Sequence, residues 1–218
     1  MEKTNIPKRT GFLFVIFFGS LMSLNAQTLK DFFTSSETPV FYFGIDFTKA
    51  KLIDDVNANV NDIRDRQYDG INELVITESK KYDLKAAFHK SNIDHDLALV
   101  SKRNQKANTE EIKSTSSGDF HRLKEDDIKS LVSGFDFGDK KGIGLLFVVE
   151  AMSKSEKAAA IWVTLIDIKA KKVLMTDRVE GKASMSFGFR NYWATTIKNV
   201  IEHIEKKKYD EWKAKYGS

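Results

Sequence analysis

Residues 142–150 read Gly-Ile-Gly-Leu-Leu-Phe-Val-Val-Glu, and they indicate the fold more clearly than any other segment. The stretch from Ile143 to Val149 is almost continuously apolar and then meets the charged Glu150. A short apolar run with such boundaries is typical of a strand that is buried on both faces. We therefore expect residues 143–149 to form the central strand of a sheet.

Two further strands and a long helix are predicted after this segment. Residues 158–168 and 173–180 are the strands, and polar turns at 153–157 and 169–172 separate them. Three consecutive strands joined by short turns favour an antiparallel meander. The helix follows from an apolar stripe with helical spacing, and we expect it to cover one face of the meander. The stripe consists of Phe189, Trp193, Ile197, Val200, Ile201 and Ile204.

The segments before residue 142 give alternating helix and strand signals. Residues 40–47 are rich in aromatic and β-branched side chains, and their alternation places Phe41, Phe43, Ile45 and Phe47 on one face of a strand. We expect helices near 54–66, 71–79 and 123–132, a strand near 96–101 and a polar surface loop near 102–120. The order predicts an α+β fold with a mostly antiparallel sheet. That sheet contains the C-terminal meander and is covered by helices, including the long C-terminal amphipathic helix.

Residues 1–26 are predicted to be an export signal. Lys3, Lys8 and Arg9 precede an apolar run from Gly11 to Leu24, and small residues follow it up to Ala26. The run is shorter than the roughly 20 residues that a membrane-spanning helix needs. We expect cleavage after residue 26 to leave a single α+β domain at 27–218 with no stable membrane span.

The chain contains no cysteine. This excludes disulfides, cysteine-based zinc or iron–sulfur sites, a thiol nucleophile and the acylated cysteine of a bacterial lipoprotein. Together with the export signal, it predicts a soluble periplasmic or extracellular protein that is not a lipoprotein.

The net charge gives no sign of a nucleic-acid partner. Lys and Arg number 35 and Asp and Glu number 31, so the formal charge is only +4. Lysines at 206–208, 213 and 215 form a basic C-terminal segment, which we interpret as a solvated face. We therefore expect no nucleic acid among the partners.

The common catalytic and cofactor motifs are missing from the sequence. The glycines between 134 and 144 precede a strand, whereas phosphate-binding glycine loops follow a strand and open a helix. His89, His95 and His121 match no compact metal-site spacing, and no G-x-S-x-G motif is present. We expect no catalytic residues, no metal and no cofactor.

Two groups of residues are candidates for binding. The first is the stretch from Ser186 to Trp193, in which Phe187, Phe189, Arg190 and Tyr192 combine aromatic and polar side chains. Such a mixture suits a binding patch, and it equally suits a helix N-terminus packed under a sheet.

The second group consists of Glu150 and Asp46, which stand at the ends of apolar strands. A buried carboxylate needs a partner, and Arg190, Lys182 or the ring hydrogens of Tyr192 and Trp193 are candidates. Such a partner makes the carboxylates either a structural ion pair or part of a polar ligand cleft.

The same residues resemble those of a group of exported bacterial proteins of unknown function. The resemblance rests on Asn25-Ala26-Gln27, on Phe41-Tyr42-Phe43-Gly44-Ile45-Asp46-Phe47, on Gly142-Ile143-Gly144 and on Gly188-Phe189-Arg190-Asn191-Tyr192-Trp193. The C-terminal third, with Leu165-Ile166-Asp167-Ile168, a lysine-rich turn, Val173-Leu174 and a final helix, is similar to envelope domains typified by the CsgG and TolB amino-terminal folds. That resemblance implies an assembly or interaction module.

The sequence leads to one principal functional hypothesis and one alternative. The principal one is a noncatalytic envelope protein that binds another envelope protein through the aromatic segment or the basic tail. The alternative is a protein that binds a small molecule or glycan, or a carboxylate-based hydrolase. In the alternative, Glu150, Asp46 and Arg190 line one cleft, and a hydrolase of this kind would need two carboxylates about 5 to 10 Å apart.

Overall fold

The computed structural model describes residues 29–218, so the predicted export signal at 1–26 lies outside the described residues. The central strand is β5 (Ile143–Ser153), and every one of its residues is buried. It begins where the apolar run begins and continues past Glu150. Strands β6 (Ala158–Asp167) and β7 (Lys172–Lys182) follow it, and both pairings of this meander are antiparallel.

The other side of β5 carries parallel strands. Strands β1 (Val40–Asp46) and β2 (Lys51–Ile53) lie one after the other along β5 and run in its direction. The short strands β3 (Asp94–His95) and β4 (Lys113–Ser114) add to β1 and β2, again in parallel. The prediction of a mostly antiparallel sheet is therefore wrong, because four of the six strand pairings are parallel.

The parallel pairing has a simple physical origin. About ninety residues separate β2 from β5, and the helices that they form carry the chain back to the end of the sheet where β1 begins, because Ile143 pairs with Val40. A crossover of this kind permits parallel neighbours, whereas a short turn permits only antiparallel ones. The presence of both helices and strands agrees with the predicted α+β class.

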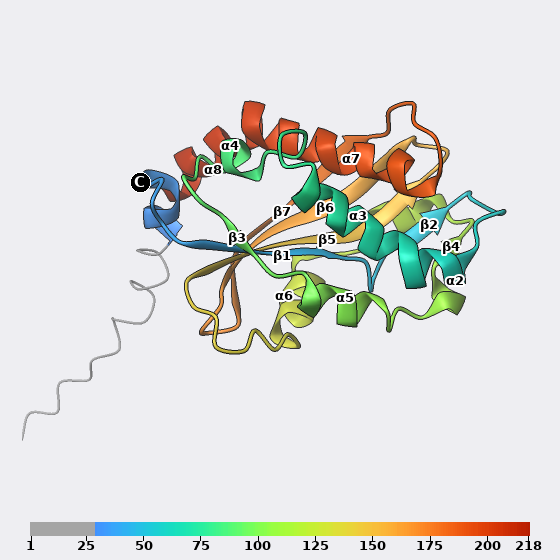
Figure 1. The fold of residues 1–218 in the computed structure, drawn as a ribbon, viewed down its shortest axis with the longest axis horizontal. Coiled ribbons are helices and arrows are strands. Elements are labelled where there is room, and N and C mark those ends of the chain that lie inside the picture. Colours follow the sequence, from blue (N-terminus) through green and yellow to red (C-terminus); the bar gives the residue numbers. More distant parts are fainter. Residues whose placement is uncertain (1–28) are drawn as a thin grey trace, which may run out of the picture.

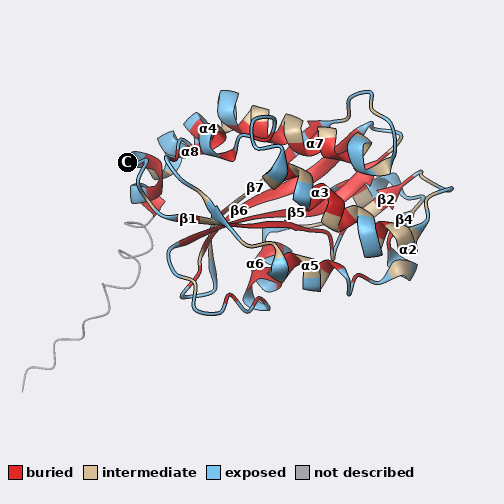
Figure 2. Ribbon diagram, in the orientation of Figure 1, coloured by how far each residue is buried: buried red, intermediate tan, exposed pale blue. Residues whose placement is uncertain are grey.

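Helices cover both faces of the sheet (Figure 1). One layer contains α3 (Tyr68–Thr77), α4 (Leu84–Ala87), α7 (Phe189–His203) and α8 (Tyr209–Tyr216). The other contains α5 (Ala98–Asn104) and α6 (Glu125–Ser133). Figure 2 shows that the central strands and the inward helix faces are buried while the outward helix faces are exposed, as expected for a sheet between two amphipathic layers.

The remaining elements are short. They are α2 (Val60–Asp62), the π-helical η1 (Ile63–Gln67) and η4 (Ile204–Lys208), and the 3-10 helices η2 (Thr109–Glu111) and η3 (Ser117–His121). The predicted long C-terminal helix is present, and η4 joins α7 to α8 within it. The strand predicted at 96–101 is wrong, because these residues lead into helix α5. The predicted loop at 102–120 contains the end of α5, all of η2 and β4, and most of η3.

A bulge in β1 reverses its side-chain alternation. Gly44 has a φ of +98°, and the pairing with β5 shifts between Tyr42 and Gly44. As a result Phe43 packs in the core on the α6 side, while Ile45 packs in the core on the α7 side. The prediction that these two side chains share a face is wrong, because one extra residue in a strand inverts every later position.

Two buried asparagines complete the hydrogen bonding of β1 beyond the end of β3. The Ile45 N–H donates to the Asn72 side chain at 2.7 Å, and the Phe47 N–H donates to the Asn104 side chain at 2.7 Å. Both asparagine amides donate to the Ile45 carbonyl at 3.0 Å. Since Asn72 lies on α3 and Asn104 on α5, this edge of the sheet is closed by one side chain from each helical layer.

Candidate functional site

The predicted aromatic segment forms the loop before α7 and the first turn of that helix. Gly188 precedes the helix with a φ of +79°, and Trp193 is buried in the core, where it continues the apolar stripe. Phe187 lies outside the helix and is 91% exposed. The helical end of the segment therefore packs into the core, while its loop end faces solvent and stays a candidate for binding.

Two further exposed apolar side chains belong to the same end of the molecule. Met185 is 97% exposed on the loop that carries Phe187, and Val56 is 70% exposed on the loop after β2. Segments of both loops line one hollow of about 410 Å³, together with Phe189 and Tyr192 of α7. Val56 itself lines a separate hollow beside β4, so we call Met185, Phe187, Phe189 and Tyr192 the aromatic surface.

The hollow beside the aromatic surface also has polar groups. The Lys154 ammonium lies 4.0 Å from the centre of the Tyr192 ring and 3.8 Å from an Asp55 carboxylate oxygen. The side chains of Asn57 and Asn59 lie along the same wall. Sequence reasoning missed Lys154 and the loop after β2, since they reach the aromatic segment only because β2 lies beside β5 in the sheet.

Arg190 occupies a different place from the one that a shared cleft would need. A side-chain carbon added at Gly70 of α3 would lie 2.8 Å from the Arg190 Cδ. The arginine stem therefore packs across α3, on the helix layer that contains α7. The structure does not bring Arg190 together with Glu150 or Asp46.

Glu150 is fully buried and has three hydrogen-bond donors. The Leu123 N–H donates to its Oε1 at 2.6 Å, while the Trp162 ring N–H at 3.2 Å and the Arg178 Nε at 2.8 Å donate to its Oε2. The predicted need for a partner is met, but by Arg178 and not by Arg190 or Lys182. Because Arg178 lies opposite Trp162 in the β6–β7 pairing, the ion pair joins β7 to β5 and to the segment before α6.

Asp46 is also fully buried and committed to an ion pair. The Arg103 Nε donates to its Oδ2 at 2.8 Å, and the Thr48 N–H donates to its Oδ1 at 2.8 Å. The Arg103 guanidinium itself lies 4.0 Å from the centre of the Phe135 ring. These contacts hold α5 and the segment after α6 against the end of β1.

The two carboxylates lie near each other but do not form a reactive pair. Asp46 pairs with Val148 in the β1–β5 register, two residues before Glu150. Each carboxylate has its own arginine and main-chain donor, and neither is exposed. Neither carboxylate group therefore faces solvent, where it could act as a proton donor or nucleophile. Asp46 and Glu150 are both members of structural ion pairs.

Residues 29–218 contain neither a metal-ligand cluster nor a membrane-spanning helix. Within them, no group of three or more His, Asp or Glu side chains is placed to hold a metal ion. The three candidate histidines lie apart on the α4 C-terminal side, in β3 and at the end of η3. No helix in this part of the chain is both long and apolar enough to span a bilayer.

The comparisons with known proteins leave the aromatic surface to be interpreted from its own chemistry. No protein-family model matches the chain, and no curated protein shows significant similarity to it.

Proposed function

We propose that this protein is a noncatalytic interaction module that binds another protein of the cell envelope through the aromatic surface. The observation that supports this most strongly is the exposure of Met185 and Phe187 on one loop, at 97% and 91%. Exposed apolar side chains that cluster at one place are typical of protein-binding sites. The placement in the envelope rests on the predicted export signal.

The chemistry of the surface suits a protein partner. Aromatic side chains are the commonest anchors of protein interfaces, and methionine adapts its shape to different apolar contacts. Lys154 provides a cation at the rim, where it already lies over the Tyr192 ring. A partner with an apolar anchor would bury Phe187 and Met185 and leave the polar hollow at the edge of the interface.

A site-specific cross-link in living cells tests this proposal. A photo-reactive phenylalanine analogue replaces Phe187 in the full chain, expressed in the cells that naturally make it. The matched control places the same analogue at Lys129, an exposed position on α6 in the opposite helix layer. We expect one discrete adduct from position 187 that position 129 does not give.

A variant then separates binding from folding. Met185→Ser with Phe187→Ser removes two solvent-facing apolar side chains, so the unfolding transition should stay unchanged while recovery of the partner falls at least tenfold. Equal recovery of the same partner by this variant, or the same adducts from positions 187 and 129, would contradict the proposal.

A further inference from the structure

We propose that a second site, the cavity between β1 and the α3–α4 corner, binds a small organic acid that has an apolar body and a hydrogen-bond acceptor at its inner end. The cavity measures about 420 Å³, which lies within the usual range of small-molecule sites. It is separate from the aromatic surface, because no residue lines both hollows. This inference therefore does not depend on the proposed function.

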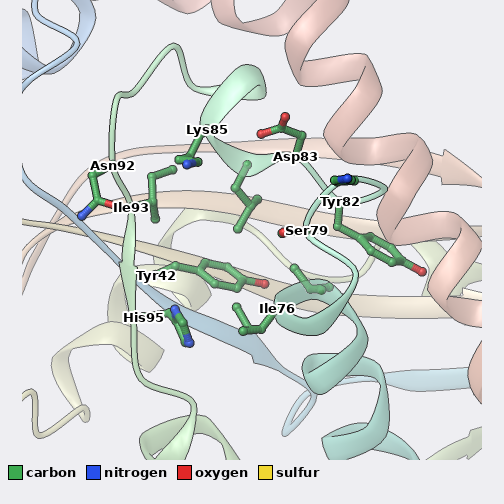
Figure 3. A pocket seen from close by; sticks show the side chains of 12 residues that line it. Tyr42, Ile76, Ser79, Tyr82, Asp83, Lys85, Asn92, Ile93 and His95 are labelled. Carbon is green, nitrogen blue, oxygen red and sulfur yellow. The ribbon is translucent and has the colours of Figure 1, made fainter.

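The cavity has an apolar interior and a polar mouth (Figure 3). Its floor consists of the buried side chains of Tyr42, Val75, Tyr82 and Leu84, and its walls include the half-buried Ile76 and Ile93. The mouth is formed by exposed polar side chains, namely Ser79, Lys80, Asp83, Lys85, Asn92 and His95. A cavity with an apolar interior and a polar mouth fits a ligand that has an apolar body and a charged head.

The Tyr42 hydroxyl is the feature that points most directly to a ligand. Tyr42 is completely buried, its ring packs edge-on to Phe147 at 5.6 Å, and its hydroxyl has no hydrogen-bond partner in the described part of the chain. Figure 3 shows the Tyr42 side chain lying across the middle of the cavity, with its hydroxyl directed toward the Ile76 and Ser79 side. A buried hydroxyl without a partner is destabilising, and an acceptor placed against it removes that penalty.

The hydroxyl is a donor under all ordinary conditions. Burial raises the pKa of Tyr42 far above its usual value, so the group stays protonated. Tyr82 also lacks a partner for its hydroxyl, but Figure 3 shows its ring turned away from Tyr42. A ligand would therefore need a hydrogen-bond acceptor, such as a ketone or ether oxygen, next to the Tyr42 hydroxyl.

The mouth favours a negative charge. Lys80 and Lys85 make no ion pair among residues 29–218, and the nearby Asp83 accepts a hydrogen bond from the Ala86 N–H at the start of α4. The lining holds two lysines and one carboxylate, and Asp94 is a second carboxylate beside it, with its Oδ1 2.8 Å from the Asn92 amide. A carboxylate head would therefore be attracted where it pairs directly with the Lys80 and Lys85 ammonium groups. Because Tyr42 has no exposed surface, we expect the half-buried Ile76 or Ile93 to move aside when the acceptor reaches it.

The test uses 7-oxooctanoate and octanoate as probes, which differ in the inner ketone. The protein obtained by expressing the full chain is titrated with each acid, and amide shifts in its ¹H–¹⁵N NMR spectrum give the location and the dissociation constant. We expect saturable shifts in α3, α4 and β3, and about tenfold tighter binding of 7-oxooctanoate. Neutral 2-octanone should bind more weakly than 7-oxooctanoate, since it has no head for the lysines.

Tyrosine variants decide whether the hydroxyl is responsible. In Tyr42→Phe the preference for 7-oxooctanoate should fall to about one, while the unfolding midpoint should stay equal or rise because the unpartnered hydroxyl is gone. Tyr68→Phe is the matched control, since Tyr68 is equally buried and its hydroxyl is also unpartnered, but it does not line the cavity. It should keep the tenfold preference.

Charge variants test the mouth. Lys80→Gln with Lys85→Gln should weaken both acids about two- to fivefold each and leave 2-octanone unchanged. Several results would overturn the inference: no saturable binding of 7-oxooctanoate, an unchanged preference in Tyr42→Phe, or equal binding of the acid and the ketone. Unaltered binding by Met185→Ser with Phe187→Ser would show that the two sites are independent.

Discussion

Replacing Arg178 by methionine should destabilise the protein through the carboxylate that it leaves behind. Arg178 donates to Glu150 at 2.8 Å, to Glu180 at 2.6 Å and to the Phe120 carbonyl at 2.5 Å. Glu150 has no exposed surface, so without its arginine it remains a buried charge with only two neutral donors. Removing one partner of such a pair typically lowers the free energy of unfolding by about 3 to 5 kcal/mol.

Urea unfolding, followed by tryptophan fluorescence and circular dichroism, measures this loss. A second variant that also carries Glu150→Leu should recover part of it, because the unpaired charge is then absent. Lys129→Met is the control, since Lys129 pairs with the highly exposed Asp126 and its loss should leave the transition unchanged. If Arg178→Met unfolds within about 1 kcal/mol of the wild type, or if the double variant is the less stable one, the buried charge does not govern this site.

Two further changes test the packing and the electrostatics of the fold. Gly181→Ala should lower the unfolding free energy by about 2 kcal/mol or more, because the added carbon would lie 2.0 Å from the Thr196 carbonyl oxygen and push α7 away from β7. Gly118→Ala is the control in the same urea assay, since its added carbon would make only an ordinary contact at 3.5 Å. Lys90 is 5% exposed, and loss of hydration lowers its pKa from 10.5 to about 8. Below pH 8 both states hold the proton, whereas between about 8 and 10.5 the unfolded chain holds a proton that the folded protein has released, so stability should rise with pH there. Thermal unfolding across this range should show the rise in the wild type relative to Lys90→Met, and parallel curves for the two proteins would contradict it.

The sequence was most informative where one local pattern leaves one stable outcome. The apolar run of β5 has no polar side chain before Glu150, so a strand buried on both faces follows directly. The stripe on α7 has helical spacing and needs an apolar sheet face to cover. The need of Glu150 for a partner was likewise predictable, because the cost of burying a charge does not depend on the fold.

Pattern reasoning failed where two distant segments meet. Leu97, Leu99 and Val100 predicted a strand over residues 96–101, yet residues 98–104 form α5, which places Val100 in the core and Asn104 against β1. The bulge at Gly44 moved Phe43 and Ile45 to opposite faces, although their spacing predicted one face. In both cases tertiary packing outweighed the local preference.

The sequence by itself determined the central strand, the meander, the long C-terminal helix and the exclusion of cysteine chemistry, because each depends on composition or on neighbouring residues. The tertiary structure alone decided the parallel half of the sheet, the choice of Arg178 for Glu150, and the meeting of the loop after β2 with the loop before α7. It also placed an unpartnered Tyr42 hydroxyl at the floor of a cavity. Each of these features joins segments that are far apart in the chain. The packing of the whole core decides which segments meet, and no single stretch of sequence contains that information.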